Sequence, residues 1–161
     1  MDAAVRLEWS ALRAAGLPSE QRSTADGSHR PHLTLFAGDQ VTVEMNAALS
    51  SLVTGLDLPV RLGALTLFGP HRDRFVLVHQ VVPSVELLHL QRRVAEICEA
   101  AELGYFAAGR WTPHVTVARR VPAPDLPAVL DVLAGVSAVD QAATVTQCRR
   151  WDSDARRTWL L

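Results

Sequence analysis

The sequence predicts an α+β fold in which a pseudo-twofold repeat forms two lobes around a central cleft. The chain has 161 residues, which suits a single domain, 1–161, made of two small lobes. Its apolar patterning changes between helical and strand periods in the order α, β, α, β, β, and this order occurs twice, over about 1–82 and 83–161. Short turn-rich links between successive strands favour antiparallel pairing. We therefore expect two mainly antiparallel sheets with the helices outside.

The first repeat unit contains two helices and three strands. Apolar residues at helical spacing predict a helix from residue 2, and Gly16 follows its end. Two apolar runs joined by the turn-rich sequence around Gly69 predict a hairpin. The helices are expected over 2–15 and 42–53, and the strands over 31–37, 58–68 and 74–82.

The second unit repeats this order. Its longest helix follows Pro83, and its apolar residues again recur at helical spacing. A closing hairpin is expected to turn at 152–154. The helices are expected over 84–102 and 125–133, and the strands over 111–118, 141–151 and 156–161.

The first β-strand of each unit carries the same four-residue pattern, which we call a cassette. The first cassette is His32-Leu33-Thr34-Leu35, the second is His114-Val115-Thr116-Val117, and a proline precedes each one. Side chains alternate across a strand, so each cassette presents an imidazole and a hydroxyl on one face and aliphatic groups on the other. We expect the two cassettes to face each other, with His32 and His114 on opposite walls of the cleft.

These groups suit the hydrolysis of a five-membered cyclic phosphodiester. Histidine ordinarily titrates near 6.5, so one imidazole can accept the proton of water while the other protonates the departing oxygen. The hydroxyls of Thr34 and Thr116 can donate to the phosphate oxygens on which charge develops. This chemistry needs no metal, no cofactor and no covalent intermediate. Which histidine is the base stays open.

The composition excludes several other chemistries. The chain contains no lysine, and all sixteen basic residues are arginine. Ligation through a lysyl adenylate, Schiff-base catalysis and a P-loop lysine are therefore excluded. The net charge of −1 gives no general basic field for duplex binding, and it favours a short oligonucleotide or a mononucleotide over long RNA.

The remaining sequence features indicate a cytoplasmic protein. Cys98 and Cys148 lack a CxxC spacing, so we expect both to be reduced and chemically inert. No apolar run approaches the roughly 18 residues that a membrane span needs. We expect a monomer with no membrane partner and no metal site, because three or four converging ligands are not indicated.

Both cassettes match the pair of His-x-Thr/Ser-hydrophobic motifs of a known superfamily. The sequences PHLTL and PHVTV, one repeat apart, resemble those of the 2H phosphoesterases, specifically the 2′-5′ RNA ligase-like branch of RNA 2′,3′-cyclic phosphodiesterases. The resemblance implies an RNA-processing hydrolase that opens 2′,3′-cyclic phosphates of RNA ends or nucleotides, with weak ATP-independent 2′-5′ ligation in some members. It assigns His32 and His114 as the acid/base pair and Thr34 and Thr116 as phosphate contacts.

Three further residues are candidate substrate contacts. Arg119 occupies the place where some members of the superfamily carry a basic residue, although strict alternation turns it away from His114. Tyr105 and Phe106 precede the second cassette in a glycine-flanked loop, where they could stack on a nucleobase or pack within the loop.

Two alternatives and one departure from the superfamily pattern stay open. The pocket could bind an RNA end or a nucleotide without chemistry, or the enzyme could act on a different small cyclic phosphate. The superfamily usually has a strand before its first helix, whereas here the helix begins near Met1. We therefore expect either that one sheet lacks a strand or that translation starts upstream.

Overall fold

The computed structural model separates the chain into two compact units, each described here by itself. It describes residues 1–22, 29–38, 40–99, 104–107 and 109–161. Unit 1 comprises residues 1–33, 61–82 and 114–142, and unit 2 comprises residues 34–60, 83–113 and 143–161. Each unit therefore takes segments from both halves of the sequence.

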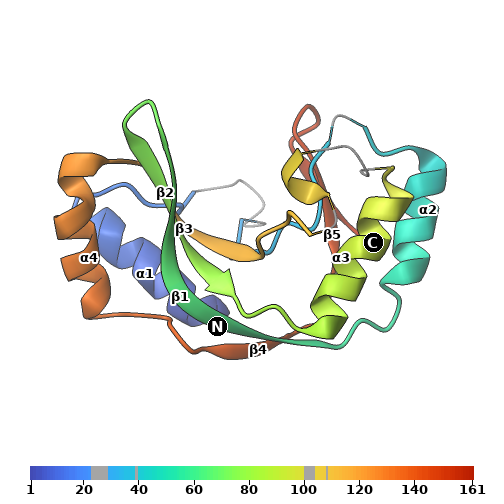
Figure 1. The fold of residues 1–161 in the computed structure, drawn as a ribbon, viewed down its shortest axis with the longest axis horizontal. Coiled ribbons are helices and arrows are strands. Elements are labelled where there is room, and N and C mark those ends of the chain that lie inside the picture. Colours follow the sequence, from blue (N-terminus) through green and yellow to red (C-terminus); the bar gives the residue numbers. More distant parts are fainter. Residues whose placement is uncertain (23–28, 39, 100–103, 108) are drawn as a thin grey trace. The chain divides into compact units, whose positions relative to one another are not determined.

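The fold is α+β with antiparallel strand pairs, as the sequence predicts (Figure 1). A four-stranded sheet has the order β3-β2-β1-β4, and β5 and β6 form a separate two-stranded sheet. In chain order the elements are α1 (Asp2–Ala14), α2 (Val43–Leu52), β1 (Leu58–His71), β2 (Arg74–Val81), α3 (Val85–Ile97), the 3-10 turn η2 (Gly104–Phe106), β3 (His114–Pro122), the 3-10 turn η3 (Ala123–Asp125), α4 (Leu126–Ala134), β4 (Ala142–Val145), β5 (Arg149–Asp152) and β6 (Arg157–Leu160).

Local signals start the helices of unit 2. The Thr42 hydroxyl accepts a hydrogen bond from the Met45 amide at the start of α2, and Ser84 does the same for the Leu87 amide at the start of α3. α3 ends before the predicted boundary at 102, and residues 100–103 lie outside the described part of the chain. None of the helices in the described part is long and apolar enough to cross a membrane.

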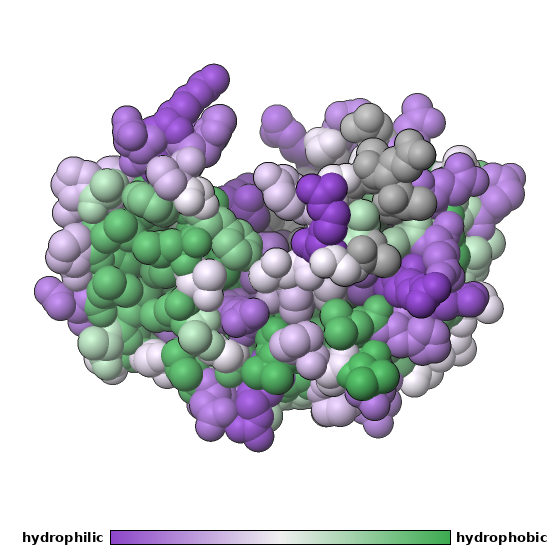
Figure 2. Space-filling view, viewed as in Figure 1, coloured by the Kyte–Doolittle hydropathy of each residue, from purple (hydrophilic) through white to green (hydrophobic). Residues whose placement is uncertain are grey.

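In unit 1, a helical layer covers the sheet. α1 packs against α4 and β3, and Figure 1 shows both helices beside these strands. Trp9 and Leu12 of α1 and Leu77 of β2 are almost fully buried. Figure 2 shows apolar groups also gathered on the surface where these helices lie. Leu7 of α1 and Leu130 of α4 are exposed apolar residues. The helix pair thus buries one apolar side against the sheet and exposes a second.

The predicted hairpin in the first half is present between β1 and β2. His71 pairs with Arg74, which leaves Arg72 and Asp73 as a two-residue turn with φ of 50° and 58°. Positive φ at both central residues is the geometry of a type I′ turn, whose twist matches that of paired strands.

In unit 2, α2 and α3 pack against each other around a small apolar core. Leu49, Val94 and Cys98 are buried at its centre. Burial raises the pKa of the Cys98 thiol above its usual value, so the thiolate is disfavoured. The β5–β6 hairpin supplies the two-stranded sheet, in which Arg150 pairs with Trp159.

Two of the predicted strands were wrong in extent. The segment 31–37 makes one isolated antiparallel bridge at Leu33 rather than a strand. The carbonyl of Thr34 instead accepts from the Trp111 indole, so a side chain takes the place of a strand partner. The predicted strand 141–151 divides into β4 and β5, because the chain leaves one sheet and enters the other.

Candidate active site

The second cassette lies on β3, at the edge of the sheet in unit 1. His114 pairs with Gln80 of β2 and Thr116 pairs with Val78, so the histidine and the threonine share one face of the sheet. Val115 and Val117 are buried on the other side. The ring of Phe68 meets the His114 ring edge-on, with the centroids 4.9 Å apart. The alternation predicted from the sequence therefore holds along this cassette.

A single bridge joins the first cassette to the second. Leu33 pairs with Val115 in antiparallel register. In that register the neighbouring residues His32 and Thr116 lie opposite each other, where Cα atoms are about 4.5–5.5 Å apart. Both histidines and Thr116 thus belong to unit 1. The expectation that His32 and His114 lie on opposite walls was wrong, because Leu33, next to His32, pairs with Val115, next to His114.

A backbone carbonyl determines which nitrogen of His32 carries the proton. Nδ1 of the exposed His32 ring lies 2.9 Å from the carbonyl oxygen of Arg30. A carbonyl can only accept a hydrogen bond, so Nδ1 carries the hydrogen and donates it. In the neutral ring, Nε2 is then left with its lone pair, the arrangement that a proton acceptor needs.

Each cassette threonine has its backbone carbonyl held by an indole. In unit 1, Trp9 Nε1 donates to the Thr116 carbonyl at 3.0 Å. In unit 2, Trp111 Nε1 donates to the Thr34 carbonyl at 3.1 Å. Nothing in the described part of the chain hydrogen-bonds to either threonine hydroxyl. Thr116 is a buried residue with 6% relative exposure, and Thr34 is half-buried.

His29 extends the histidine set of unit 1. Its ring stacks on Trp9 with centroids 5.1 Å apart and meets His32 edge-on at 6.2 Å. Its Nε2 lies 2.9 Å from the carbonyl oxygen of Glu20. Burial lowers the pKa of His29 below its usual value of 6.5, and the hydrogen bond to Glu20 partly offsets this shift. His29 is thus biased toward its neutral form next to His32.

Arg119 has an internal carboxylate partner. Its Nε donates to Glu20 Oε2 at 2.8 Å, and Arg22 lies 3.2 Å from the other oxygen of the same carboxylate. Glu20 is 3% exposed, and its amide donates to the Val117 carbonyl at the edge of β3. The Arg119 side chain remains about half exposed, so it is held at one nitrogen while much of it faces solvent.

The two aromatic candidates lie in η2 of unit 2 and differ in their surroundings. Tyr105 is 82% exposed. Phe106 packs edge-on against Phe36 with centroids 5.9 Å apart, and its carbonyl accepts from the Gln91 side chain. Of the two roles considered for this pair, exposure favours ligand contact for Tyr105 and packing favours a structural role for Phe106.

A buried pair lies behind the second cassette. His79 of β2 pairs with Val115, and its Nε2 lies 2.9 Å from both carboxylate oxygens of Glu8 on α1. Glu8 also accepts from the Ala138 amide at 2.7 Å, and both side chains are fully buried. This pair links α1 to the strand that neighbours β3.

Several of these residues were missed from the sequence, because their partners are distant along the chain. Trp9, Glu20 and Glu8 carry no local motif, and their roles follow only from the packing of α1 and the Glu20 segment onto the sheet. His29 had a weak signal in its closeness to the first cassette. Among the described residues, no group of three or more His, Cys, Asp or Glu side chains could hold a metal ion.

Comparisons with known proteins agree with this architecture. A family model described as the 2′-5′ RNA ligase superfamily matches residues 1–156. The fold is similar to the crystal structure of E. coli LigT in apo form, with a TM-score of 0.52 and 19% identity over 100% of this chain and 90% of that one.

Two further solved structures are similar. A crystal structure of a phosphoesterase has a TM-score of 0.52 and 20% identity, covering 100% of this chain and 91% of that one. E. coli LigT complexed with 3′-AMP has a TM-score of 0.51 and 19% identity, covering 100% and 89%. No curated protein matches the sequence significantly.

Proposed function

This chain belongs to the 2′-5′ RNA ligase superfamily of 2H phosphoesterases, and we propose that it hydrolyses 2′,3′-cyclic phosphates of RNA ends or nucleotides without a metal ion. The observation that carries the proposal is the bridge between Leu33 and Val115. It joins the centres of the two cassettes, so the residues that flank it can act on one small substrate.

In the proposed reaction, one histidine accepts a proton from water as the water oxygen attacks phosphorus. The bond between phosphorus and one ribose oxygen breaks, and the second histidine protonates that oxygen. The product is a phosphate monoester, and the proton count balances because one imidazole gains a proton and the other loses one. His32 and His114 are proposed for these roles, and the Nδ1–H of His32 is already fixed by the Arg30 carbonyl.

The hydroxyls of Thr34 and Thr116 are proposed to donate to the non-bridging oxygens of the phosphate. Charge grows on these oxygens as the fifth bond to phosphorus forms, so donors aimed there stabilise the transition state more than the ground state. The carbonyls of both threonines are held by indoles, which restricts the backbone that carries each hydroxyl.

Arg119 and Tyr105 are proposed as contacts to the rest of the substrate. Arg119 can interact with a phosphate through the exposed part of its guanidinium, and the exposed Tyr105 ring can stack on a base. A nucleotide substrate is also supported by the LigT structures determined with NADP+ and with 3′-AMP. Phe106 is proposed to support this loop by packing on Phe36.

The test is turnover of a 2′,3′-cyclic nucleotide and of an oligonucleotide with a cyclic-phosphate end, both in EDTA. We expect His32→Ala and His114→Ala each to lower kcat/KM by about 10²–10⁴-fold, the usual size of an acid–base contribution. Thr34→Ala and Thr116→Ala should cost about 10²-fold, whereas the Ser variants, which keep the hydroxyl, should cost much less.

His89→Ala is the matched control, because His89 is an exposed residue of α3 outside both cassettes. This variant should retain wild-type activity. Absence of turnover of either substrate across the range in which histidine titrates would contradict the proposal. Tight binding of a cyclic-phosphate end without turnover would instead indicate a binding module, and turnover of only another small cyclic phosphate would reassign the substrate.

A further inference from the structure

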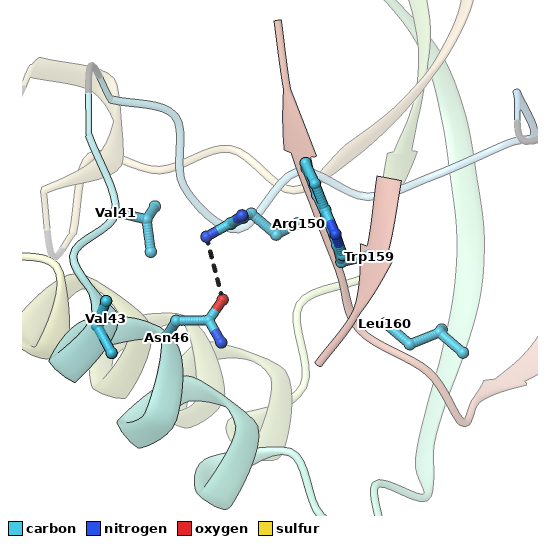
Figure 3. Close-up of a pocket in the computed structure, with 6 residues that line it drawn as sticks. All are labelled: Val41, Val43, Asn46, Arg150, Trp159 and Leu160. Atoms are coloured by element: carbon cyan, nitrogen blue, oxygen red, sulfur yellow. Dashed lines mark hydrogen bonds between the residues drawn. The ribbon is translucent and has the colours of Figure 1, made fainter. Parts of the chain in front are cut away.

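A pocket of about 270 Å³ in unit 2 has no part in the proposed reaction (Figure 3). It lies between the start of α2 and the β5–β6 hairpin. Figure 3 shows the Arg150 side chain reaching from the hairpin toward Asn46 of α2. The residues that line the pocket are Val41, Val43, Asn46, Arg150, Trp159 and Leu160.

Among the residues that the structure describes, the guanidinium of Arg150 has neutral partners only. Its Nη1 donates to Asn46 Oδ1 at 3.3 Å, and its Cζ lies 4.6 Å from the centroid of the Trp159 ring. Its Nε is buried and has no hydrogen-bond acceptor among the described residues. Within the part of the chain that the structure describes, no carboxylate forms an ion pair with Arg150. A partly buried cation is normally paired, so this one lacks an anion.

Two acidic residues lie close in sequence to residues that line the pocket, and both have hydrogen-bond partners other than Arg150. Glu44 lies in the first turn of α2, where hydrogen bonds from its own amide and from Thr42 lower the pKa of its carboxyl group. Asp152 pairs across the hairpin with Arg157, but its Oδ1 accepts from the amides of Asp154 and Ala155.

A second arginine adds positive charge near the Trp159 ring. The Cζ of Arg157 lies 5.6 Å from the centroid of the Trp159 ring. The lining also includes the apolar Val41 and Val43 on the α2 side, and Leu160 of the hairpin, whose side chain points away from Arg150. One guanidinium in the lining, with a second near the same ring, suits a ligand with one anionic group and one apolar part.

We propose that this pocket binds a small oxyanion, the phosphate or carboxylate group of a ligand whose apolar or aromatic part contacts Val41 and Val43. The two terminal nitrogens of the guanidinium offer planar donors that match two oxygens of such a group, and the anion would balance a charge that no carboxylate of the described residues pairs with. The pocket lies wholly within unit 2, so the proposal does not depend on the phosphodiesterase activity.

The experiment follows the indole N–H signal of Trp159 by NMR, assigned by its loss in Trp159→Phe. The intact protein is titrated with inorganic phosphate, AMP and benzoate at millimolar concentrations, with sodium chloride at equal ionic strength as the salt control. We expect a saturable shift with phosphate-bearing or carboxylate-bearing probes. The comparison of AMP with benzoate identifies which oxyanion the pocket prefers.

Two variants with a matched control test the role of Arg150. Arg150→Gln should weaken binding by about tenfold or more, because a charge-assisted hydrogen bond is lost. Arg149→Gln removes the same charge from the next residue of β5, whose guanidinium bonds to Gln147, and it should leave binding unchanged. Val43→Glu adds a competing carboxylate at a position that is 81% exposed, so it should weaken binding without endangering the fold.

Three outcomes would overturn the proposal. The first is no saturable shift with any of the three probes. The second is a shift that sodium chloride reproduces. The third is wild-type binding by both Arg150→Gln and Val43→Glu. The indole signals of the other three tryptophans report whether each variant is folded.

Discussion

In the second cassette, His114 and Thr116 lie on a strand that is paired along its length with β2, whereas the first cassette meets β3 at one bridge and then leaves the sheet. The second cassette is also backed by the buried Glu8–His79 pair. His32 is exposed, and its ring is oriented by the Arg30 carbonyl. The two cassettes thus have nearly identical sequences but are positioned differently. The sheet positions the second cassette, whereas local hydrogen bonds position the first.

The two cassettes share one kind of support. Each threonine carbonyl is held by an indole N–H, from Trp9 in one case and from Trp111 in the other. The hydrogen bond to Thr116 is buried and the one to Thr34 is partly buried. Because one hydrogen bond is buried and the other is only partly buried, removing them should change the protein's stability and activity by unequal amounts.

The largest stability effect is expected behind the second cassette. Glu8→Ala leaves the buried His79 ring and the Ala138 amide without their acceptor, so the free energy of unfolding should fall by about 3–5 kcal/mol. Urea denaturation measures this change. Glu8→Gln keeps one oxygen acceptor and should cost less. A loss below about 1 kcal/mol for Glu8→Ala, the size of an average substitution, would show that the pair does not support β3.

Removing the indole hydrogen bond should also lower the free energy of unfolding more at the second cassette than at the first. Trp9→Phe leaves a buried carbonyl without its donor and should lower the free energy of unfolding by about 1–3 kcal/mol. Trp111→Phe removes a partly buried hydrogen bond and should cost about 0.5–1.5 kcal/mol. Chemical denaturation of both variants provides the comparison. Equal costs, or a larger cost for Trp111→Phe, would contradict the inferred difference in anchoring.

The smallest effect is expected next to the first cassette and depends on pH. The pKa of His29 is lowered in the folded state, so as pH falls the unfolded chain binds this proton first. The stability present above pH 6.5 should therefore be lost as pH falls from there through the lower folded pKa. His29→Gln should remove this part of the acid sensitivity. Thermal unfolding of both proteins on either side of 6.5 is the check, and identical losses would contradict it.

Much of the fold could be predicted from local patterns. Helical spacing predicts α1, α2, α3 and α4 within a few residues, and turn-forming sequence predicts the β1–β2 hairpin. The segment 31–37 could not be assigned correctly, because the Trp111 indole occupies the Thr34 carbonyl and no local pattern indicates this contact. The division of 141–151 into β4 and β5 likewise depends on which sheet each half joins.

The residues of the candidate site could likewise be predicted only where a local pattern indicates them. The duplicated His-x-Thr pattern predicts four candidate residues, because strand alternation is a local rule. It does not predict that Glu20 binds Arg119 or that Glu8 binds His79, since these partners come from segments far apart in the chain. It also does not predict that Leu33 pairs with Val115, because pairing depends on the tertiary register.

That register is the central claim, and NMR of the intact protein tests it most directly. We expect a cross-strand NOE between backbone protons of Leu33 and Val115, of the kind that should also be seen between β2 and β3 at Val78 and Thr116. The β2–β3 signal serves as the internal standard. A spectrum that contains the Val78–Thr116 contact but no contact between Leu33 and Val115 would contradict the account.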